Sequence, residues 1–273
     1  MVDLPSYLRR IGHDGPVAPT LDTLRALHAR HPAAIAFESL DPFLGRPVSI
    51  DPATVRTKLV GGARGGYCHE HNLLFHDVLA AIGFRVTALG ARVAWMAQGR
   101  INPRTHRLTL VDLPEGRFLA DVGFGGQTPT APLRLVPREV QPTPHGTYRV
   151  VADPEGFALE MRIARDRWEP LYRFSTTPQP HADFEVANWF TGAHPRSRFV
   201  ANLIAAIVRD DRRINLLNAD LAIRHPDGRA EQRRLDGPAN LAAVLEGTMG
   251  IALPAPAEEL WVRLPAVPVP PWP

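Results

Sequence analysis

The sequence predicts an α+β protein with a helical first third, a β-rich middle and a mixed last third. Up to residue 83, apolar residues recur at helical spacing between capping residues and glycines. From residue 84 onward, short β-rich runs alternate with Pro, Gly and Asp turns, and from residue 183 both patterns occur. With 273 residues, the chain is long enough to bury a large core and to form about two domains.

Composition indicates a soluble globular protein. Hydrophobic residues make up 45% and charged residues 22% of the chain, which excludes a disordered, collagen-like or coiled-coil protein. Apolar runs stay far below the roughly 20 residues of a membrane helix, so we expect no membrane association. The N-terminus lacks the pattern of a secretory signal, so we expect a cytoplasmic protein. A net charge of only +3, with arginines scattered among acids, does not suggest nucleic-acid binding.

Capping residues delimit the predicted helices of the first third. The expected helices cover residues 6–11, 21–31, 53–60 and 68–82. Thr20 caps the second helix and Pro32 follows its expected end, whereas Gly83 ends the last one. Cys68 therefore stands at a helix N-terminus.

Strands dominate the rest of the predicted secondary structure. In the middle, the expected strands cover residues 84–96, 107–111, 118–122, 148–151, 157–163 and 168–174. Short antiparallel strands of this kind close into a barrel. The last part is expected to hold helices over 183–191 and from 236–238 toward 249, and strands over 199–209, 213–217, 220–225 and 231–235. Residues 265–273 are expected to form a polyproline-like tail.

Cys68 is the only cysteine, which excludes an internal disulfide and suits a reducing compartment. A thiol reacts as its thiolate, and the dipole and free N–H groups of a helix N-terminus stabilise that anion. We expect Gly65 and Gly66 to let another molecule approach the sulfur, and Arg64 to add positive charge nearby. These observations favour a reactive thiol over an inert buried one.

A cysteine nucleophile needs a base, and the base needs an orienting acceptor. His106 begins one predicted strand, Asp121 ends the next, and a short turn over 112–116 joins the two strands. Adjacent antiparallel strands would bring the two side chains together near Cys68. The order Cys, His, Asp matches the helix-then-barrel order of papain-like enzymes. A surface histidine and a turn-capping aspartate remain the alternatives at these two positions.

A metal site is not expected. His69 and His71 flank Glu70, but positions two apart on a helix point to different sides, and the H-E-x-x-H zinc pattern would need histidine where Leu73 stands. We interpret His71 and His76 as packing or surface residues. Glu70 is expected to be a buried, hydrogen-bonded structural acid.

Residues 123–126 form a Gly-Phe-Gly-Gly loop directly after the predicted acidic residue. Successive N–H groups in such a loop can form a concave nest for phosphate oxygens. The same four residues also fit a strand-ending turn, and they lack the Lys-Ser or Lys-Thr of a mononucleotide P-loop. Phe37 and Phe199 are apolar residues that belong either to the core or to the wall of a cleft.

Residues 64–72, Arg-Gly-Gly-Tyr-Cys-His-Glu-His-Asn, resemble the R-G-G-x-C-x-E-x-N signature of the arylamine N-acetyltransferases at every fixed position. Residues 105–108 resemble the family's histidine motif, and residues 121–128 its aspartate and glycine-loop motif. The likeness extends to 35–40, although Ala36 stands where the family has Pro and Ser39 where it has Asn, and to 188–190 and 194–199.

This resemblance implies an α+β fold with a papain-like cysteine-enzyme core in three domains. An N-terminal helical bundle over 1–83 would carry the nucleophile, and a central antiparallel β-barrel over 84–182 would carry the histidine and the aspartate. Residues 183–273 would form a C-terminal α/β lid with the proline-rich tail.

The resemblance also implies ping-pong transfer of acetyl from acetyl-CoA to arylamines, arylhydrazines or arylhydroxylamines, without a metal. Cys68 would hold the acetyl group, His106 would move protons and Asp121 would orient the imidazole. A triad cysteine hydrolase, an amide synthase of the same superfamily and a non-catalytic binding protein are the competing hypotheses. Homo-oligomerisation is left open.

The resemblance further assigns two substrate regions. Gly125 and Gly126 would approach the CoA pyrophosphate. Apolar side chains would line the acceptor cleft, namely those of Phe37, Val93, Phe124 and Phe199.

Overall fold

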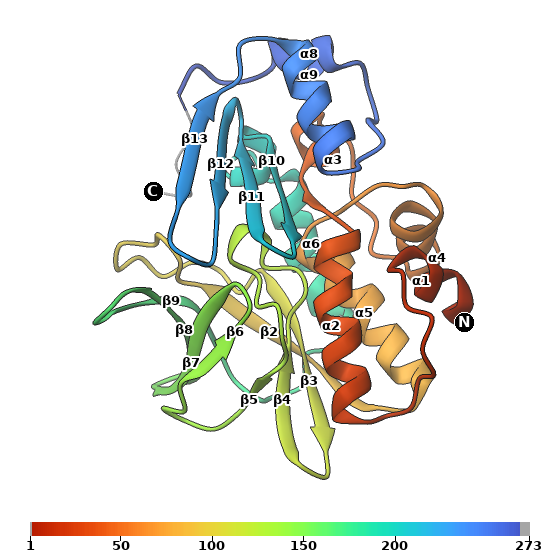
Figure 1. Ribbon diagram of the computed structural model, residues 1–273, viewed down its shortest axis with the longest axis vertical. Coiled ribbons are helices and arrows are strands. Elements are labelled where there is room, and N and C mark those ends of the chain that lie inside the picture. The colour runs from red at the N-terminus through yellow and green to blue at the C-terminus, as the bar shows by residue number, and fades with distance from the viewer. Residues whose placement is uncertain (1, 268–273) are drawn as a thin grey trace.

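A computed structural model of the chain describes residues 2–267 and has a helical part, a barrel and a second sheet (Figure 1). The helical part comprises α1 (Leu4–Arg10), α2 (Leu21–Ala34), α3 (Leu40–Phe43), α4 (Pro52–Arg56), the π-helical turn η1 (Thr57–Gly61) and α5 (Cys68–Ile82). The short strand β1 (Phe37–Glu38) follows α2. The sequence did not predict α3 or β1.

Local capping explains where these helices begin and end. The Thr20 side chain accepts a hydrogen bond from the Thr23 N–H at 3.3 Å, and Gly83 ends α5 with a φ of 104°. The expected end of α2 at Pro32 is wrong, because the helix continues through Pro32 to Ala34. A proline removes one N–H donor. Pro32 is buried in the fold, and local sequence does not show that burial.

The middle of the chain forms one antiparallel sheet that curls into a nearly closed barrel. Its strands are β2 (Arg85–Val93), β3 (His106–Leu113), β4 (Gly116–Ala120), β5 (Leu133–Arg134), β6 (Gln141–Thr143), β7 (Gly146–Asp153), β8 (Gly156–Ala164) and β9 (Arg167–Phe174). Their order in the sheet is β5-β4-β3-β2-β9-β8-β7-β6. The predicted α+β class and barrel are therefore confirmed, although β5 and β6 were not predicted.

The two edge strands of this sheet are joined by a side chain. The Gln141 amide accepts from the Arg134 N–H at 2.7 Å and donates to the Arg134 carbonyl at 3.0 Å. The amide thereby gives the edge of β5 the two hydrogen bonds that a neighbouring strand would supply.

The last part of the chain comprises α6 (His181–Ala193), α7 (Arg198–Ala201), β10 (Ile204–Arg209), β11 (Arg212–Leu217), β12 (Asp220–Arg224), β13 (Ala230–Arg234), α8 (Pro238–Ala242), the π-helical turn η3 (Ala243–Thr248) and α9 (Ala257–Val262). The second sheet has the order β1-β10-β11-β12-β13. Phe199 was expected in a strand but lies in α7, because the Ser197 hydroxyl accepts from the Phe199 N–H at 3.2 Å and caps the helix. Residues 268–273 of the predicted tail lie outside the described residues.

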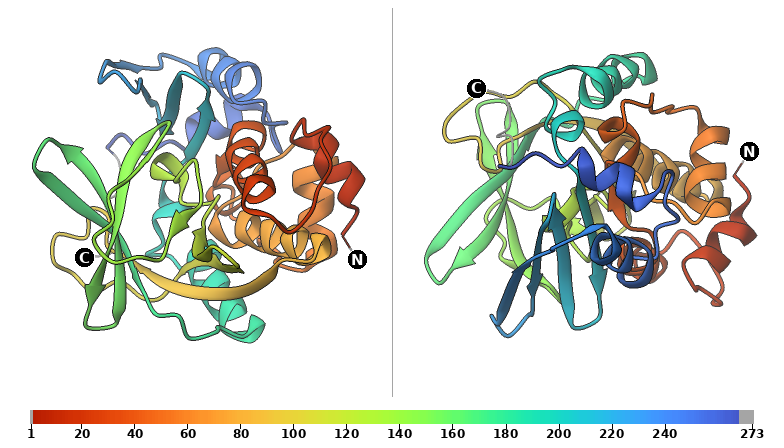
Figure 2. Two further views of the ribbon diagram at one scale, coloured as in Figure 1. Left: turned by 60° about the horizontal axis from the view of Figure 1, so that its bottom comes forward. Right: turned by 90° about the horizontal axis from the view of Figure 1, so that it is seen from above.

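Three large apolar cores hold these parts together, and a fourth, small cluster is formed by Phe37, Tyr67 and Ala206. One lies between the helices and the outer face of the barrel, where α5 residues meet Val111 and Phe118. A second fills the barrel, to which β3 contributes Leu108 and Leu110 on its opposite face. The third covers one face of the second sheet with α3, α8, η3 and α9, and Figure 2 shows α8 and α9 beside that sheet. No helix among the described residues is long and apolar enough to span a membrane.

Candidate active site

Cys68 is the first residue of α5 and is buried, with 5% of its surface exposed. The N-terminal turn of this helix is fixed by Glu70, whose carboxylate accepts from the Tyr67 N–H at 3.0 Å. The Tyr67 hydroxyl donates to Asn188 Oδ1 of α6 at 2.6 Å. The thiol sulfur lies 3.7 Å from the Thr105 carbonyl oxygen. The sulfur is thus held beside the segment that leads into β3.

His106 and Asp121 meet because β3 and β4 pair in antiparallel register. His106 is the first residue of β3 and Asp121 directly follows β4. His106 Nε2 lies 2.7 Å from Asp121 Oδ2, and both side chains are almost completely buried. With Nε2 engaged by the carboxylate, Nδ1 is the ring atom left for the thiol. Phe124 and Tyr172 enclose the imidazole at ring-centroid distances of 5.1 and 5.0 Å.

The Asp121 carboxylate favours the protonated imidazole. Burial alone would lower the pKa of His106, but the Asp121 charge and hydrogen bond, together with the Cys68 side chain, raise it to about 10. Burial likewise raises the pKa of Asp121, but His106, Asn72 and the Gly123 N–H outweigh this effect and hold it below its usual value. The site therefore stabilises a buried imidazolium next to a carboxylate and a thiol.

Asn72 connects the helix to both strands, a role that sequence reasoning did not assign. It lies one turn after Cys68, and its Nδ2 donates to Asp121 Oδ1 at 2.9 Å and to the Arg107 carbonyl at 2.6 Å. Its Oδ1 accepts from the Val122 N–H at 3.1 Å. The position at i+4 from the cysteine was the available signal, because it places Asn72 on the same helix face as Cys68.

His28 contacts the acidic residue from a second helix. Its Nε2 accepts from the Asp121 backbone N–H at 3.2 Å, so this ring nitrogen carries no proton. Burial lowers the pKa of His28 to about 4, which keeps the ring neutral at pH 7.

The glycine loop is packed tightly against the site. A Cβ at Gly123 would lie 3.1 Å from the Cys68 Cα, and a Cβ at Gly126 would lie 2.6 Å from Asn215 Oδ1. Gly125 has a φ of 78°, a conformation that favours glycine. The Arg213 guanidinium secures the loop by donating to the Thr128 carbonyl at 2.8 Å.

Two expectations about the residues before Cys68 are wrong. A Cβ at Gly65 would lie 2.0 Å from the Ala36 carbonyl oxygen, and a Cβ at Gly66 would lie 2.5 Å from the Glu70 carboxylate. These glycines therefore allow close packing within the chain, and not the approach of another molecule. Arg64 is also engaged elsewhere, since its Nη2 lies 2.7 Å from Glu38 Oε1.

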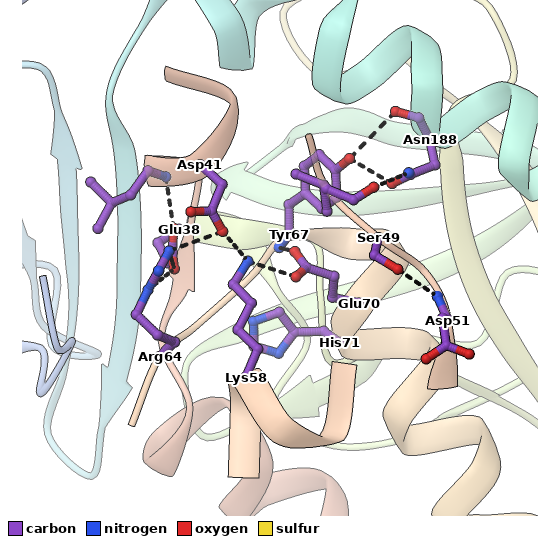
Figure 3. A network of polar contacts seen from close by, with 12 residues as sticks. Glu38, Asp41, Ser49, Asp51, Lys58, Arg64, Tyr67, Glu70, His71 and Asn188 are labelled. Carbon is purple, nitrogen blue, oxygen red and sulfur yellow. Dashed lines mark hydrogen bonds and ion pairs between the residues drawn. The ribbon is translucent and has the colours of Figure 1, made fainter. Parts of the chain in front are cut away.

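Arg64 belongs to a partly buried ion-pair network between β1, α3, η1 and α5 (Figure 3). Asp41 Oδ2 lies 3.1 Å from Arg64 Nη2 and 2.7 Å from Lys58 Nζ. Lys58 Nζ in turn lies 2.6 Å from Glu70 Oε1. Glu70 is thus the buried structural acid expected from the sequence.

The thiol opens onto a small cavity of about 150 Å³. Cys68 and His106 line it together with the residues Phe37, Val93, Trp95, Asn102, Pro103, Thr105, Gly123, Phe124, Phe190, Thr191, Arg196, Ser197, Arg198 and Phe199. All four residues predicted for an acceptor cleft line this cavity with apolar side chains, namely Phe37, Val93, Phe124 and Phe199.

A larger cleft of about 710 Å³ adjoins the small cavity. The two share the side chains of Phe37, Trp95, Phe124, Arg198 and Phe199. Gly125 and Gly126 line the larger cleft, as do three arginines of the second sheet, Arg224, Arg233 and Arg234. Among residues 2–267, no three His, Cys, Asp or Glu side chains are grouped so that they could hold a metal ion.

Comparison with known proteins agrees with this site. A family model described as N-acetyltransferase matches residues 20–257. Arylamine N-acetyltransferase from Mycobacterium tuberculosis is 43% identical over 98% of this chain and 99% of its own length. The chain belongs to the arylamine N-acetyltransferase family. It is therefore an acetyltransferase that acts on arylamines.

Two further relatives of this family bear on the substrates. The structure of Mycobacterium marinum arylamine N-acetyltransferase in complex with CoA matches with a TM-score of 0.91 and 43% identity, covering 96% of this chain and 98% of that one. Proansamycin X synthase from Amycolatopsis mediterranei is 34% identical over 67% of this chain and 71% of its own length.

Proposed function

We propose that the chain transfers acetyl from acetyl-CoA to the nitrogen of arylamines and arylhydrazines, or to the oxygen of arylhydroxylamines, by a ping-pong mechanism. Cys68 carries the acetyl group, His106 moves the protons and Asp121 orients the imidazole. The observation that supports this most directly is the buried His106–Asp121 pair beside the thiol that faces the small cavity. Residues 1–83, 84–182 and 183–273 are proposed to act as helical bundle, barrel and lid.

In the first half-reaction, His106 Nδ1 accepts the thiol proton of Cys68. The resulting thiolate attacks the acetyl carbonyl of the thioester, and the bond between that carbonyl and the CoA sulfur breaks. The imidazolium returns its proton to the departing CoA thiolate. One thioester replaces another, so this step is nearly balanced in free energy.

In the second half-reaction, the nitrogen of the arylamine attacks the acetyl group on Cys68. His106 accepts the proton that the nitrogen loses, and then returns it to the Cys68 sulfur as the thioester bond breaks. Asp121 accepts the hydrogen bond from Nε2–H in both half-reactions. It thereby fixes the tautomer in which Nδ1 is free to exchange a proton with the sulfur. The product is an amide, and its formation from a thioester is favourable.

The larger cleft is suited to the CoA part of the donor. A nucleotide with phosphate groups needs cationic side chains and backbone N–H groups, and this cleft offers Arg224, Arg233 and the Gly125–Gly126 turn. Gly125 and Gly126 line this cleft and carry no side chains, so their backbone is open to the phosphates. The CoA complex of the M. marinum relative supports this assignment.

The small cavity is suited to an aromatic acceptor. Phe37, Val93, Phe124 and Phe199 give it apolar walls beside the thiol. An aromatic amine is largely neutral at pH 7 and enters such a cavity with its lone pair free. An alkylamine is mostly protonated at pH 7, so its transfer into the cavity is unfavourable because the ammonium group loses its hydration.

The test is the intact mass of the protein after incubation with acetyl-CoA, with and without aniline. We expect one added acetyl group on Cys68 that disappears when aniline is supplied, with formation of acetanilide. The matched control is Cys68→Ser, which should gain no acetyl group because the same histidine cannot ionise a hydroxyl. An absence of the acetyl adduct at all times would contradict the proposal. Hydrolysis of the adduct in water alone would favour the hydrolase. An adduct that is not transferred to aniline, together with release only of acyl groups that carry their own amine, would favour the amide synthase.

A further inference from the structure

Arg198 carries a cation that no acidic side chain among residues 2–267 neutralises. It lies in α7 and lines both the small cavity and the larger cleft. Its Nε is buried and has no hydrogen-bond partner among the described residues. Burial lowers the pKa of Arg198, and no nearby carboxylate opposes this effect. Its ring contact is with Phe199, whose centroid lies 6.0 Å from the guanidinium carbon.

The walls of the small cavity make this cation unusual. No Asp or Glu is among the described residues that line it. Two arginines line it, of which Arg196 is exposed. The imidazolium of His106 also lines the cavity, but the Asp121 carboxylate already pairs with it. The rest of the wall is apolar or uncharged. A partly desolvated guanidinium without a partner attracts an anion, and carboxylate is the group that matches its planar geometry.

We propose that Arg198 selects acceptors, by binding a carboxylate carried on the ring of the arylamine. This inference rests on the proposed function. A cavity of about 150 Å³ with apolar walls holds a single benzene ring. A one-ring acceptor whose amine faces Cys68 therefore brings its ring substituents to the cavity wall, where Arg198 lies. The predicted preferred class is the aminobenzoates.

A phosphate of the donor is the other anion that could reach Arg198, because this residue also borders the larger cleft. That cleft has its own cations in Arg224 and Arg233. The small cavity depends on Arg198 and on Arg196 at the surface. The charge distribution therefore favours the acceptor as the source of the anion.

The test compares 4-aminobenzoate with 4-aminobenzamide, which has the same ring and a neutral substituent of similar shape. For the wild-type protein we expect a higher kcat/KM for 4-aminobenzoate. In Arg198→Met the ratio of the two kcat/KM values should fall roughly ten- to hundredfold, the effect of losing a charged hydrogen bond. Arg198→Lys should retain part of the preference, and Arg25→Met, a change on the exposed side of α2, should retain all of it.

Binding of benzoate, measured by calorimetry on the wild type and on Arg198→Lys, provides a readout that does not depend on turnover or on the folding of Arg198→Met. We expect wild-type binding and at least severalfold weaker binding by the lysine variant. An unchanged ratio in the variants, or a rise only in the KM for acetyl-CoA, would overturn the inference. Acetylation of Cys68 without any preference for 4-aminobenzoate would overturn it and leave the proposed function intact. Failure of Cys68 to acetylate at all would instead refute the proposed function.

Discussion

Replacing Asp121 with Asn tests the proposed triad at a single atom. Asp121 Oδ1 accepts from Asn72 Nδ2 and from the Gly123 N–H, at 2.9 and 3.0 Å. In the variant, the amide oxygen must keep these two donors, so the amide NH₂ takes the place of Oδ2 and faces His106. His106 Nε2 then has to accept a hydrogen bond. The neutral imidazole must carry its proton on Nδ1, and it can no longer take the proton of Cys68.

The magnitude follows from the ionisation of His106. Its pKa of about 10 lies about 3.5 pH units above the ordinary value of 6.5, and each pH unit corresponds to about 1.4 kcal/mol. Burial opposes the charge, but the Asp121 carboxylate and the Cys68 side chain outweigh it, so that the site as a whole stabilises the imidazolium by roughly 5 kcal/mol relative to the ring in water. Without the carboxylate, burial favours the neutral ring. We expect kcat to fall about 10³- to 10⁴-fold, as in Ser-His-Asp enzymes that lose the same carboxylate.

Two assays check this prediction. The first is steady-state acetylation of 4-aminobenzamide, and the second is the rate at which iodoacetamide alkylates Cys68 at pH 7. The variant should be alkylated more slowly than the wild type, because its histidine no longer takes the proton of the thiol. Circular dichroism and a thermal melt verify that the variant is folded. A folded variant that keeps more than a tenth of the wild-type kcat would remove Asp121 from the mechanism.

Three other changes probe the structure around the site. Lys58→Met removes the cation beside buried Glu70 and should lower the free energy of unfolding by about 3–5 kcal/mol in urea titrations. The double variant Lys58→Met/Glu70→Gln should recover part of this loss. A loss below about 1 kcal/mol would show that the ion pair does not stabilise the fold. Gly126→Ala places a Cβ 2.6 Å from Asn215 Oδ1 and should raise the KM for acetyl-CoA severalfold, unlike Gly247→Ala, which meets no atom within 4 Å. An equal KM for acetyl-CoA in both variants would show that the Gly125–Gly126 turn does not take part in donor binding. Buried histidines should make the protein sensitive to acid, because between about pH 6.5 and their lower folded pKa they bind protons only in the unfolded chain. In this range each histidine lowers the free energy of unfolding by up to about 1.4 kcal/mol for each pH unit of acidification. The folded pKa values are about 4 for His28, His71 and His76 and about 3 for His69. Urea midpoints should therefore fall steadily from pH 7 to pH 5, and a constant midpoint would show that these rings are already protonated in the folded state.

Local signals predicted much of the scaffold of this site. Helix α5 was predicted over Cys68–Ile82 because its apolar spacing and Gly83 are both contained in one short segment. The proximity of His106 and Asp121 followed from one hairpin, whose short turn fixes the pairing of its strands.

Features that depend on distant parts of the chain were not predicted. Strand β1 consists of two residues, and it exists because Phe37 pairs with Ala206 of β10. The end of α2 was misplaced because the burial of Pro32 is a tertiary effect. The role of Asn72 was missed for the same reason, since its partners Arg107, Asp121 and Val122 come from other elements.

The partly buried position of Lys58 limits what the proposed acetyl-cysteine can do to its own chain. Lys58 is the only lysine in the sequence. Burial alone would lower its pKa, but the charges of Glu70, Glu38 and Asp41 outweigh this effect and raise it, so the ammonium has no lone pair to offer. An acetyl thioester that waits for its acceptor thus finds no free side-chain amine on its own surface. Transfer of the acetyl group to a lysine side chain of the same chain is therefore not expected, and amine-directed labels should spare Lys58.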